Sequence, residues 1–171
     1  METWDTIRSR RNVRSFEDRP IDAAIVDRIL EAARRTPSSM NQQAWDFVVV
    51  TDRDRLGELS KVWRYAAHVA TSAVTIALVA PLSSDADTRE TYQFDLGQAS
   101  MSIMLAAADE GIGSCHAAIG EQGLAREILE LPDDRECMWL IALGYPADRP
   151  LAPIERPTRR PFDDVVHRDR W

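Results

Sequence analysis

The sequence predicts a single domain in which helices cover both faces of a mixed β-sheet, a fold of the α/β or α+β class. Segments with helical spacing of apolar residues alternate with short apolar runs that are typical of buried strands. The chain has 171 residues, which fits one domain, and it contains neither an internal repeat nor an interdomain linker. Its composition, 44% hydrophobic and 29% charged, is that of a soluble globular protein.

The first half of the chain combines helices and strands. Asp22 is a plausible N-cap for a helix with an apolar stripe, and Pro37 disfavours helix at the residue before it. We expect, in order, a short helix at residues 3–10, a second helix that ends before Thr36, a polar loop at 37–43, a buried strand at 46–50, a surface helix at 54–64 and a strand at 72–80.

The second half is organised around one long helix. After a polar connection at 81–89 we expect this helix at residues 90–110, ended by Gly111. Its middle, from Leu96 to Ala108, is apolar nearly all round, which predicts burial and, in a chain this short, a subunit interface. Further on we expect a strand or extended segment at 114–119, a helix at 122–131 and a strand at 137–143.

The C-terminal segment, residues 147–171, has a different composition. It is too rich in proline to be a helix, and it ends in a stretch that contains Phe162, two valines and Trp171. A tail with these side chains should pack on this domain or on a partner subunit.

Several classes of function are disfavoured. The net charge of −7 argues against a general nucleic-acid binder. The glycine fingerprints of nucleotide-binding turns and the nucleophile elbow of hydrolases are absent, and the two cysteines have no metal-ligand spacing. We therefore expect no metal site, and we interpret His68 as a packing residue with satisfied hydrogen bonds.

The N-terminus lacks the apolar core of a signal peptide, and we expect a cytoplasmic protein with no membrane and no nucleic-acid partner.

Anion-binding and neutral hydrogen-bonding side chains are clustered. Guanidinium groups bind phosphate in a bidentate manner, and loop hydroxyls and amides can contact the edge of a heterocycle. Together they suit a phosphorylated aromatic cofactor, although the arginines could instead be solvated charges paired with the 28 acidic residues. The candidate residues are Arg10, Arg11 and Arg14 near the start, Ser38, Ser39, Asn41 and Gln43 on the loop, and Arg156, Arg159 and Arg160 near the end.

Four segments resemble motifs of the FMN-dependent nitroreductase family. The chain is similar to the family's opening signature at residues 8–16, to its A-P-S-x-x-N-x-Q-P-W motif at 32–45, and to later blocks at 111–115 and 141–146. The basic end at Arg159-Arg160-Pro161 also resembles that of the family. The resemblance spans essentially the whole chain, and four motifs in the family's order make it strong.

The resemblance implies an α+β homodimer with FMN at the subunit interface, NADPH or NADH as electron donor, and reduction of a small acceptor such as a nitroaromatic or quinone by a ping-pong mechanism. It implies phosphate, ribityl and pyrimidine contacts from one subunit and contacts from the loop of the other, while the tail packs on the partner. It implies no catalytic side chain; Arg14 is our candidate for stabilising the reduced flavin. The implied cofactor-binding residues are Arg10, Arg11, Asn12, Arg14, Pro37, Ser38, Ser39, Asn41, Gln43, His116, Ala117, Ala118, Ile119, Arg159 and Arg160.

The chain departs from the family pattern at three positions. Asn12 replaces a serine, Ala44 replaces a proline, and His116 stands where compact members often have tryptophan. These departures leave substrate choice open. The alternatives are a flavin-binding protein of the same fold with different chemistry, such as flavin cleavage or dehalogenation, and a non-enzymatic protein that binds anions or flavin.

Overall fold

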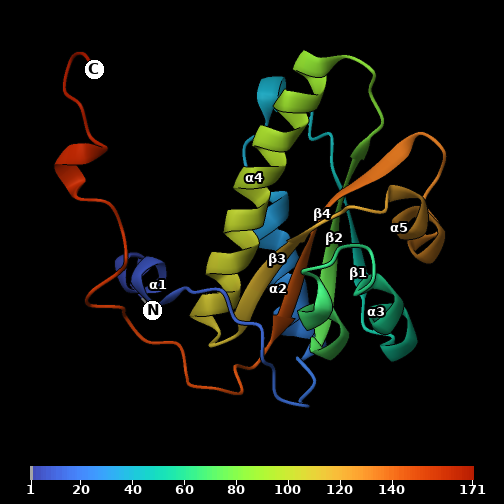
Figure 1. The fold of residues 1–171 in the computed structure, drawn as a ribbon, viewed down its shortest axis with the longest axis horizontal. Helices are drawn as coiled ribbons and strands as arrows, with labels where there is room; N and C mark the ends of the chain where they lie inside the picture. Colours follow the sequence, from blue (N-terminus) through green and yellow to red (C-terminus); the bar gives the residue numbers. More distant parts are fainter. Residues whose placement is uncertain (1) are drawn as a thin grey trace.

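The computed structural model describes residues 2–171 and has a four-stranded sheet at its centre (Figure 1). The strands are β1 (Asp46–Val50), β2 (Val74–Pro81), β3 (Gly113–Ala118) and β4 (Arg135–Gly144), in the order β1-β2-β4-β3. All three strand pairs are antiparallel, so the mixed pairing that we expected is limited to one isolated parallel bridge between Asn12 and Ser114. The predicted α+β class is confirmed.

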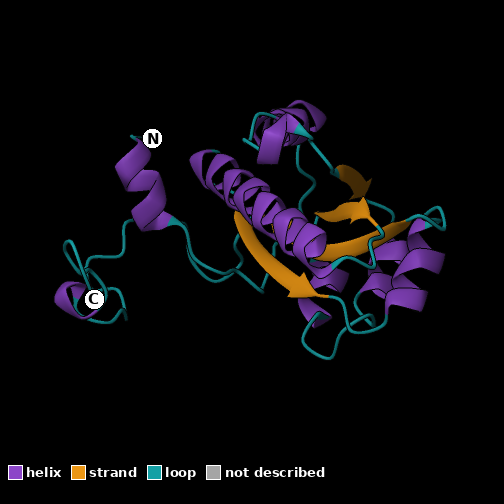
Figure 2. Cartoon of the chain, turned by 90° about the horizontal axis from the view of Figure 1, so that it is seen from above, coloured by secondary structure: helices purple, strands orange, loops and turns teal. Residues whose placement is uncertain are grey.

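Helices cover both faces of this sheet, as Figure 2 shows. On one face α2 (Ala23–Arg34) and α4 (Ala86–Asp109) bury apolar side chains against β2 and β4. On the other face α3 (Arg53–Leu59) and α5 (Gln122–Leu129) close a second apolar cluster. The remaining elements are α1 (Thr3–Ser9) and the short 3-10 helices η1 (Ser39–Asn41), η2 (Ala67–Thr71) and η3 (Phe162–Asp164).

Local capping explains where the helices begin. The Asp22 carboxylate accepts a hydrogen bond from the Ala24 backbone N–H at 2.8 Å, as its predicted N-cap role requires. Asp85 does the same for Thr88 at 2.9 Å, so α4 begins at Ala86 and the predicted polar connection at 81–89 is wrong over its last four residues. The predicted helix at 54–64 is also too long, because α3 ends at Leu59.

The long helix α4 is buried on one side only. Leu96, Ile103 and Ala107 lie in the core, whereas Phe94 is 71% and Met101 41% exposed. The expected all-round burial is therefore absent within one chain. Phe94, Gly97 and Met101 follow one another at helical spacing, which leaves an exposed apolar stripe along α4.

The N-terminal segment is fixed against the free edge of the sheet. The Val13 N–H donates to the Ser114 carbonyl at 2.9 Å, and the Val13 side chain is buried. Gly113 lies so close to it that a Cβ at that position would approach the Val13 side chain to 2.7 Å. A side chain is therefore excluded at Gly113, and this close approach sets the path of the arginine-rich segment.

The C-terminal tail leaves the body of the molecule. Backbone hydrogen bonds from Ala147 to Ser15 and from Ile154 to Arg8, both 3.0 Å, hold its first part against the N-terminal segment. Beyond this point the chain runs alone in both ribbon views (Figures 1 and 2), with Phe162 66% and Trp171 99% exposed. Among residues 2–171 there is no helix long and apolar enough to span a bilayer.

The packing at Gly113 predicts a stability change. Replacing Gly113 with Ala should lower the free energy of unfolding by about 1–3 kcal/mol, because overpacking displaces Val13. Gly57→Ala in α3 is the matched control: its Cβ meets open space, so the better helix propensity of Ala should raise stability by up to about 1 kcal/mol. Urea denaturation measures both; equal effects of the two changes would contradict this account.

Candidate functional site

The arginine-rich segment lies where α1 ends and the chain joins the edge of β3. Arg10 follows α1 directly, and its guanidinium donates to the Asn12 side-chain oxygen at 3.2 Å and lies 3.9 Å from Met104 Sδ of α4. Asn12 forms the bridge to Ser114. Arg10, Asn12 and Arg14 are thus held beside the beginning of β3 by backbone pairing.

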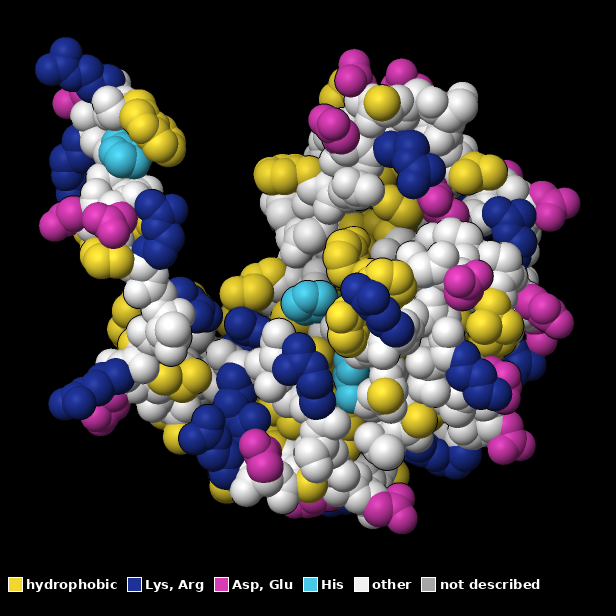
Figure 3. All heavy atoms as spheres, viewed as in Figure 1, with side chains coloured by type: hydrophobic (Ala, Val, Ile, Leu, Met, Phe, Trp, Pro, Cys, Tyr) yellow, Lys and Arg dark blue, Asp and Glu magenta, His cyan; other side chains and the backbone are white. Residues whose placement is uncertain are grey.

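A hollow of about 600 Å³ opens next to this segment. It is bordered by the exposed side of β3, by β4 and by the connection that leads into η2. Figure 3 shows this face, with histidine side chains among arginines and hydrophobic groups. The lining residues are Arg14, Trp63, Arg64, Tyr65, Ala67, His68, His116, Ala117, Ala118 and Trp139.

Fixed positive charge dominates the electrostatics of this hollow. Partial burial lowers the pKa of His116, and the nearby Arg10 and Arg14 charges lower it further. Burial raises the pKa of Cys115, while the same two arginines act in the opposite direction. The histidine and the thiol are therefore neutral at pH 7. The charged side chains that line the hollow are Arg14 and Arg64, and Arg10 lies close enough to act on His116.

His68 differs from the satisfied packing residue that we expected. It is 93% buried, since its exposed fraction is 7%, and its Nε2 has no hydrogen-bond partner. Burial lowers the pKa of His68 and the Arg14 charge lowers it further, while backbone groups of Cys115 and Tyr65 near the ring act in the opposite direction. A neutral imidazole with an unused nitrogen therefore lies in the wall of the hollow, where a buried polar atom ordinarily has a partner.

Arg11 points to another partner. Its guanidinium donates to the Asp148 carboxylate at 2.7 Å and to the Arg149 carbonyl at 2.8 Å. This contact ties the beginning of the C-terminal tail to the N-terminal segment and holds the pKa of the Asp148 carboxyl below its usual range. Within one chain Arg11 is thus a tail contact and not part of the hollow.

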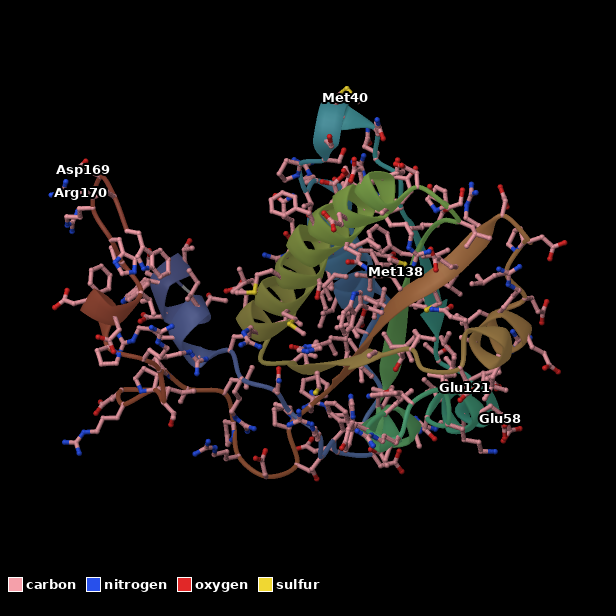
Figure 4. The ribbon with its side chains drawn as sticks, turned by 45° about the horizontal axis from the view of Figure 1, so that its top comes forward. Met40, Glu58, Glu121, Met138, Asp169 and Arg170 are labelled. Atoms are coloured by element: carbon pink, nitrogen blue, oxygen red, sulfur yellow. The ribbon has the colours of Figure 1, made fainter. Side chains whose placement is uncertain are left out.

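The loop 37–43 lies at the opposite end of α4. Figure 4 places Met40 at its tip, beyond the N-terminal half of the helix. The loop lines a separate hollow of about 740 Å³ together with α4. The lining residues are Pro37, Ser38, Ser39, Asp87, Glu90, Thr91, Phe94, Asp95 and Gln98, and none of them lines the hollow along β3.

The backbone of this loop is strained. Met40, Asn41 and Gln43 have φ values of 47°, 55° and 51°, a conformation that side chains with a Cβ rarely adopt. Each such residue costs of order 1–3 kcal/mol, so the surrounding contacts must hold the loop in place. Strain of this kind is concentrated at functional sites.

The structure therefore brings some predicted residues together and leaves others apart. Arg10, Asn12, Arg14 and the β3 residues His116, Ala117 and Ala118 form one group, whereas Ile119 follows β3 and packs against the second apolar cluster. Pro37, Ser38, Ser39 and Asn41 form a second group at the loop, and Gln43 lies beside Trp45 in a neighbouring groove. Arg159 and Arg160 lie on the exposed tail, where they donate to the Thr158 and Asp164 carbonyls.

Sequence reasoning missed the aromatic and basic residues at the rim of the hollow. The Trp63 and Tyr65 rings meet edge to face with centres 5.9 Å apart, and the Arg64 guanidinium lies 4.6 Å from the Tyr65 ring centre. Trp139 packs edge-on against His116, with ring centres 5.8 Å apart. The Trp-Arg-Tyr triplet is the available signal, but the helix expected at 54–64 includes Trp63 and Arg64, whereas α3 ends at Leu59.

The donor set of the β3 hollow fits FMN. Arg10 and Arg14 offer guanidinium groups to a phosphate dianion or an electron-rich ring edge, and Asn12 offers an amide. The hollow has aromatic walls, Trp63, Tyr65 and Trp139, that suit a flat ring system. Residues 2–171 contain no cluster of side chains that could hold a metal ion.

Comparison with known proteins identifies the family to which this sequence is similar. The model of the nitroreductase family matches residues 7–75 and 58–145. A "Putative NADH dehydrogenase/NAD(P)H nitroreductase" of Methanothermobacter thermautotrophicus is 30% identical, with 100% of this chain and 88% of the relative aligned. An FMN reductase [NAD(P)H] of Bacillus subtilis is 24% identical, over 99% of this chain and 74% of the relative.

Solved structures agree with this result. A nitroreductase family protein from Clostridium novyi is 30% identical and superposes with a TM-score of 0.80, covering 86% of this chain and 87% of that one. The family model spans most of the chain, and the fold is the same. This chain belongs to the nitroreductase family.

Proposed function

We propose that this chain is an FMN-dependent oxidoreductase that takes electrons from NADH or NADPH and reduces a small acceptor such as a nitroaromatic or quinone. The observation that carries this proposal is the hollow along β3, which has aromatic walls, is lined by Arg14 and has Arg10 close by. Relatives named as NAD(P)H nitroreductase and as FMN reductase support the same donor and cofactor.

The proposed enzyme is a homodimer with two composite sites. One chain would supply Arg10, Asn12, Arg14 and β3. The other chain would supply the loop with Ser38 and Ser39, because this loop lies apart from β3 within one chain. The exposed apolar stripe on α4 and the exposed tail support such an assembly, since both leave large hydrophobic side chains uncovered. The tail, residues 147–171, would pack on the partner and carry Arg159 and Arg160 toward its phosphate site.

The protein's part in the reaction is binding and electrostatics. FMN, when bound, supplies the acceptance and donation of hydride, which needs no nucleophilic side chain. Arg10 would hold the phosphate, and the fixed charge of Arg14 would stabilise negative charge on the pyrimidine edge of the cofactor. Backbone groups of Ala117 and Ala118 would lie along the ring, and the aromatic walls would exclude water. We assign no catalytic side chain.

A ping-pong reaction is the kinetic prediction. Donor and acceptor would occupy the same open face in turn, so double-reciprocal plots at several acceptor concentrations should give parallel lines. The measurement is steady-state oxidation of NADPH, and separately of NADH, with a quinone or a nitroaromatic as acceptor. Intersecting lines would contradict sequential use of one face. A flavin-loaded protein that neither nicotinamide reduces would support the alternative of different chemistry on the same fold.

The phosphate anchor gives a second prediction. Arg10→Ala should weaken FMN binding by roughly 10- to 100-fold, the effect of losing a hydrogen bond to a charged group. Arg8→Ala is the matched control, because the partly exposed Arg8 side chain faces Asp5, 3.6 Å away, and not the hollow; it should leave the affinity within about twofold. Quenching of FMN fluorescence measures the dissociation constants. Equal affinity of Arg10→Ala and wild type would show that the phosphate is held elsewhere.

A further inference from the structure

The buried carboxylate of Asp95 on α4 has a single observed role. It is 96% buried, since its exposed fraction is 4%, and both of its oxygens accept from the Ser39 backbone N–H, at 3.1 and 3.3 Å. Among residues 2–171, no arginine or lysine forms an ion pair with Asp95. Burying a polar side chain is unfavourable unless hydrogen bonds compensate for it, so the contact with the Ser39 N–H is what stabilises Asp95 at this position.

The segment that Asp95 holds is the strained one. The Ser39 N–H is the point where the chain enters the turn that contains Met40, Asn41 and Gln43 in the left-handed conformation. A second contact comes from the same face of α4. Thr36, the residue before Pro37, donates a hydrogen bond from its hydroxyl to Ser102 Oγ at 3.1 Å. Asp95 and Ser102 are seven residues apart, two turns of one helix face, so α4 clamps the loop at both of these points.

The clamp leaves the loop's hydrogen-bonding groups facing outward. Ser38 Oγ accepts from the Gln43 N–H at 2.9 Å, which keeps its own hydroxyl proton available to donate. Ser39 and Asn41 are exposed. A loop in this conformation presents several donors at once, and it does so before any ligand arrives.

We propose that Asp95 is a positioning residue that fixes the loop of one subunit in the conformation that contacts the flavin of the other. This inference rests on the proposed function for its functional consequence. Asp95 itself does not touch the cofactor; it acts through the Ser39 backbone.

The test compares Asp95→Ala, Asp95→Asn and Asp87→Asn in the full-length protein. Asp95→Ala removes the acceptor, and Asp95→Asn keeps one oxygen that can accept from Ser39. Asp87→Asn removes one charge from the same hollow without touching the loop backbone. Amide hydrogen exchange of the peptide that covers residues 38–43 reports the order of the loop and needs no flavin.

Asp95→Ala should speed amide exchange in this peptide and weaken FMN binding about 10-fold or more, the effect of losing a hydrogen bond to a charged group. Asp95→Asn should retain most of the affinity, and Asp87→Asn should match wild type in both measurements. Thermal unfolding shows whether Asp95→Ala remains folded at the temperature of both measurements.

Two results would overturn the proposal. One is unchanged exchange of the loop in Asp95→Ala. The other is faster exchange with unchanged FMN affinity, provided that the wild type binds FMN. If the wild type binds no FMN, the proposed function fails, and the exchange result still decides whether Asp95 holds the loop.

Discussion

Helix α4 fixes both halves of the candidate site. Near its C-terminal end Met104 contacts the Arg10 guanidinium, and in its N-terminal half Asp95 holds the Ser39 backbone. These two contacts are nine residues apart, which is about 13 Å along the helix axis. Because both contacts are made by one continuous helix, its length keeps the two groups apart. One chain therefore holds an arginine half and a loop half that face different hollows.

This separation explains otherwise unfavourable features of the isolated chain. The exposed stripe with Phe94 and Met101 runs along the same helix, and Gly97 in its middle leaves open space for a close approach. The tail is tied to the arginine segment by the Arg11–Asp148 pair and then extends with exposed aromatic groups. A second copy would cover the stripe, receive the tail and bring a loop to the arginines. The same association would complete the site and bury the apolar surface.

Local signals predicted most of the elements, and long-range contacts account for what was missed. Asp22 and Gly111 marked helix ends correctly because capping acts within a few residues. The start of α4 was missed because Asp85 precedes a polar run that reads as a loop. The pairing of Arg11 with Asp148 joins residues 137 positions apart, and no local pattern encodes it. His68 could not be distinguished from a satisfied core histidine, because its lack of a partner depends on the packing around it.

The composite nature of the site is the central claim, and a mixed dimer tests it most directly. Chains carrying Arg10→Ala and chains carrying Ser39→Tyr, a bulky group on the exposed loop, would be given different affinity tags, co-expressed and purified through both tags. If each site takes its arginines from one chain and its loop from the other, one site of the mixed dimer carries both changes and the other carries neither. The mixed dimer should then hold FMN at half the wild-type content, whereas each parent homodimer holds little. A mixed dimer as poor in flavin as its parents would contradict the account.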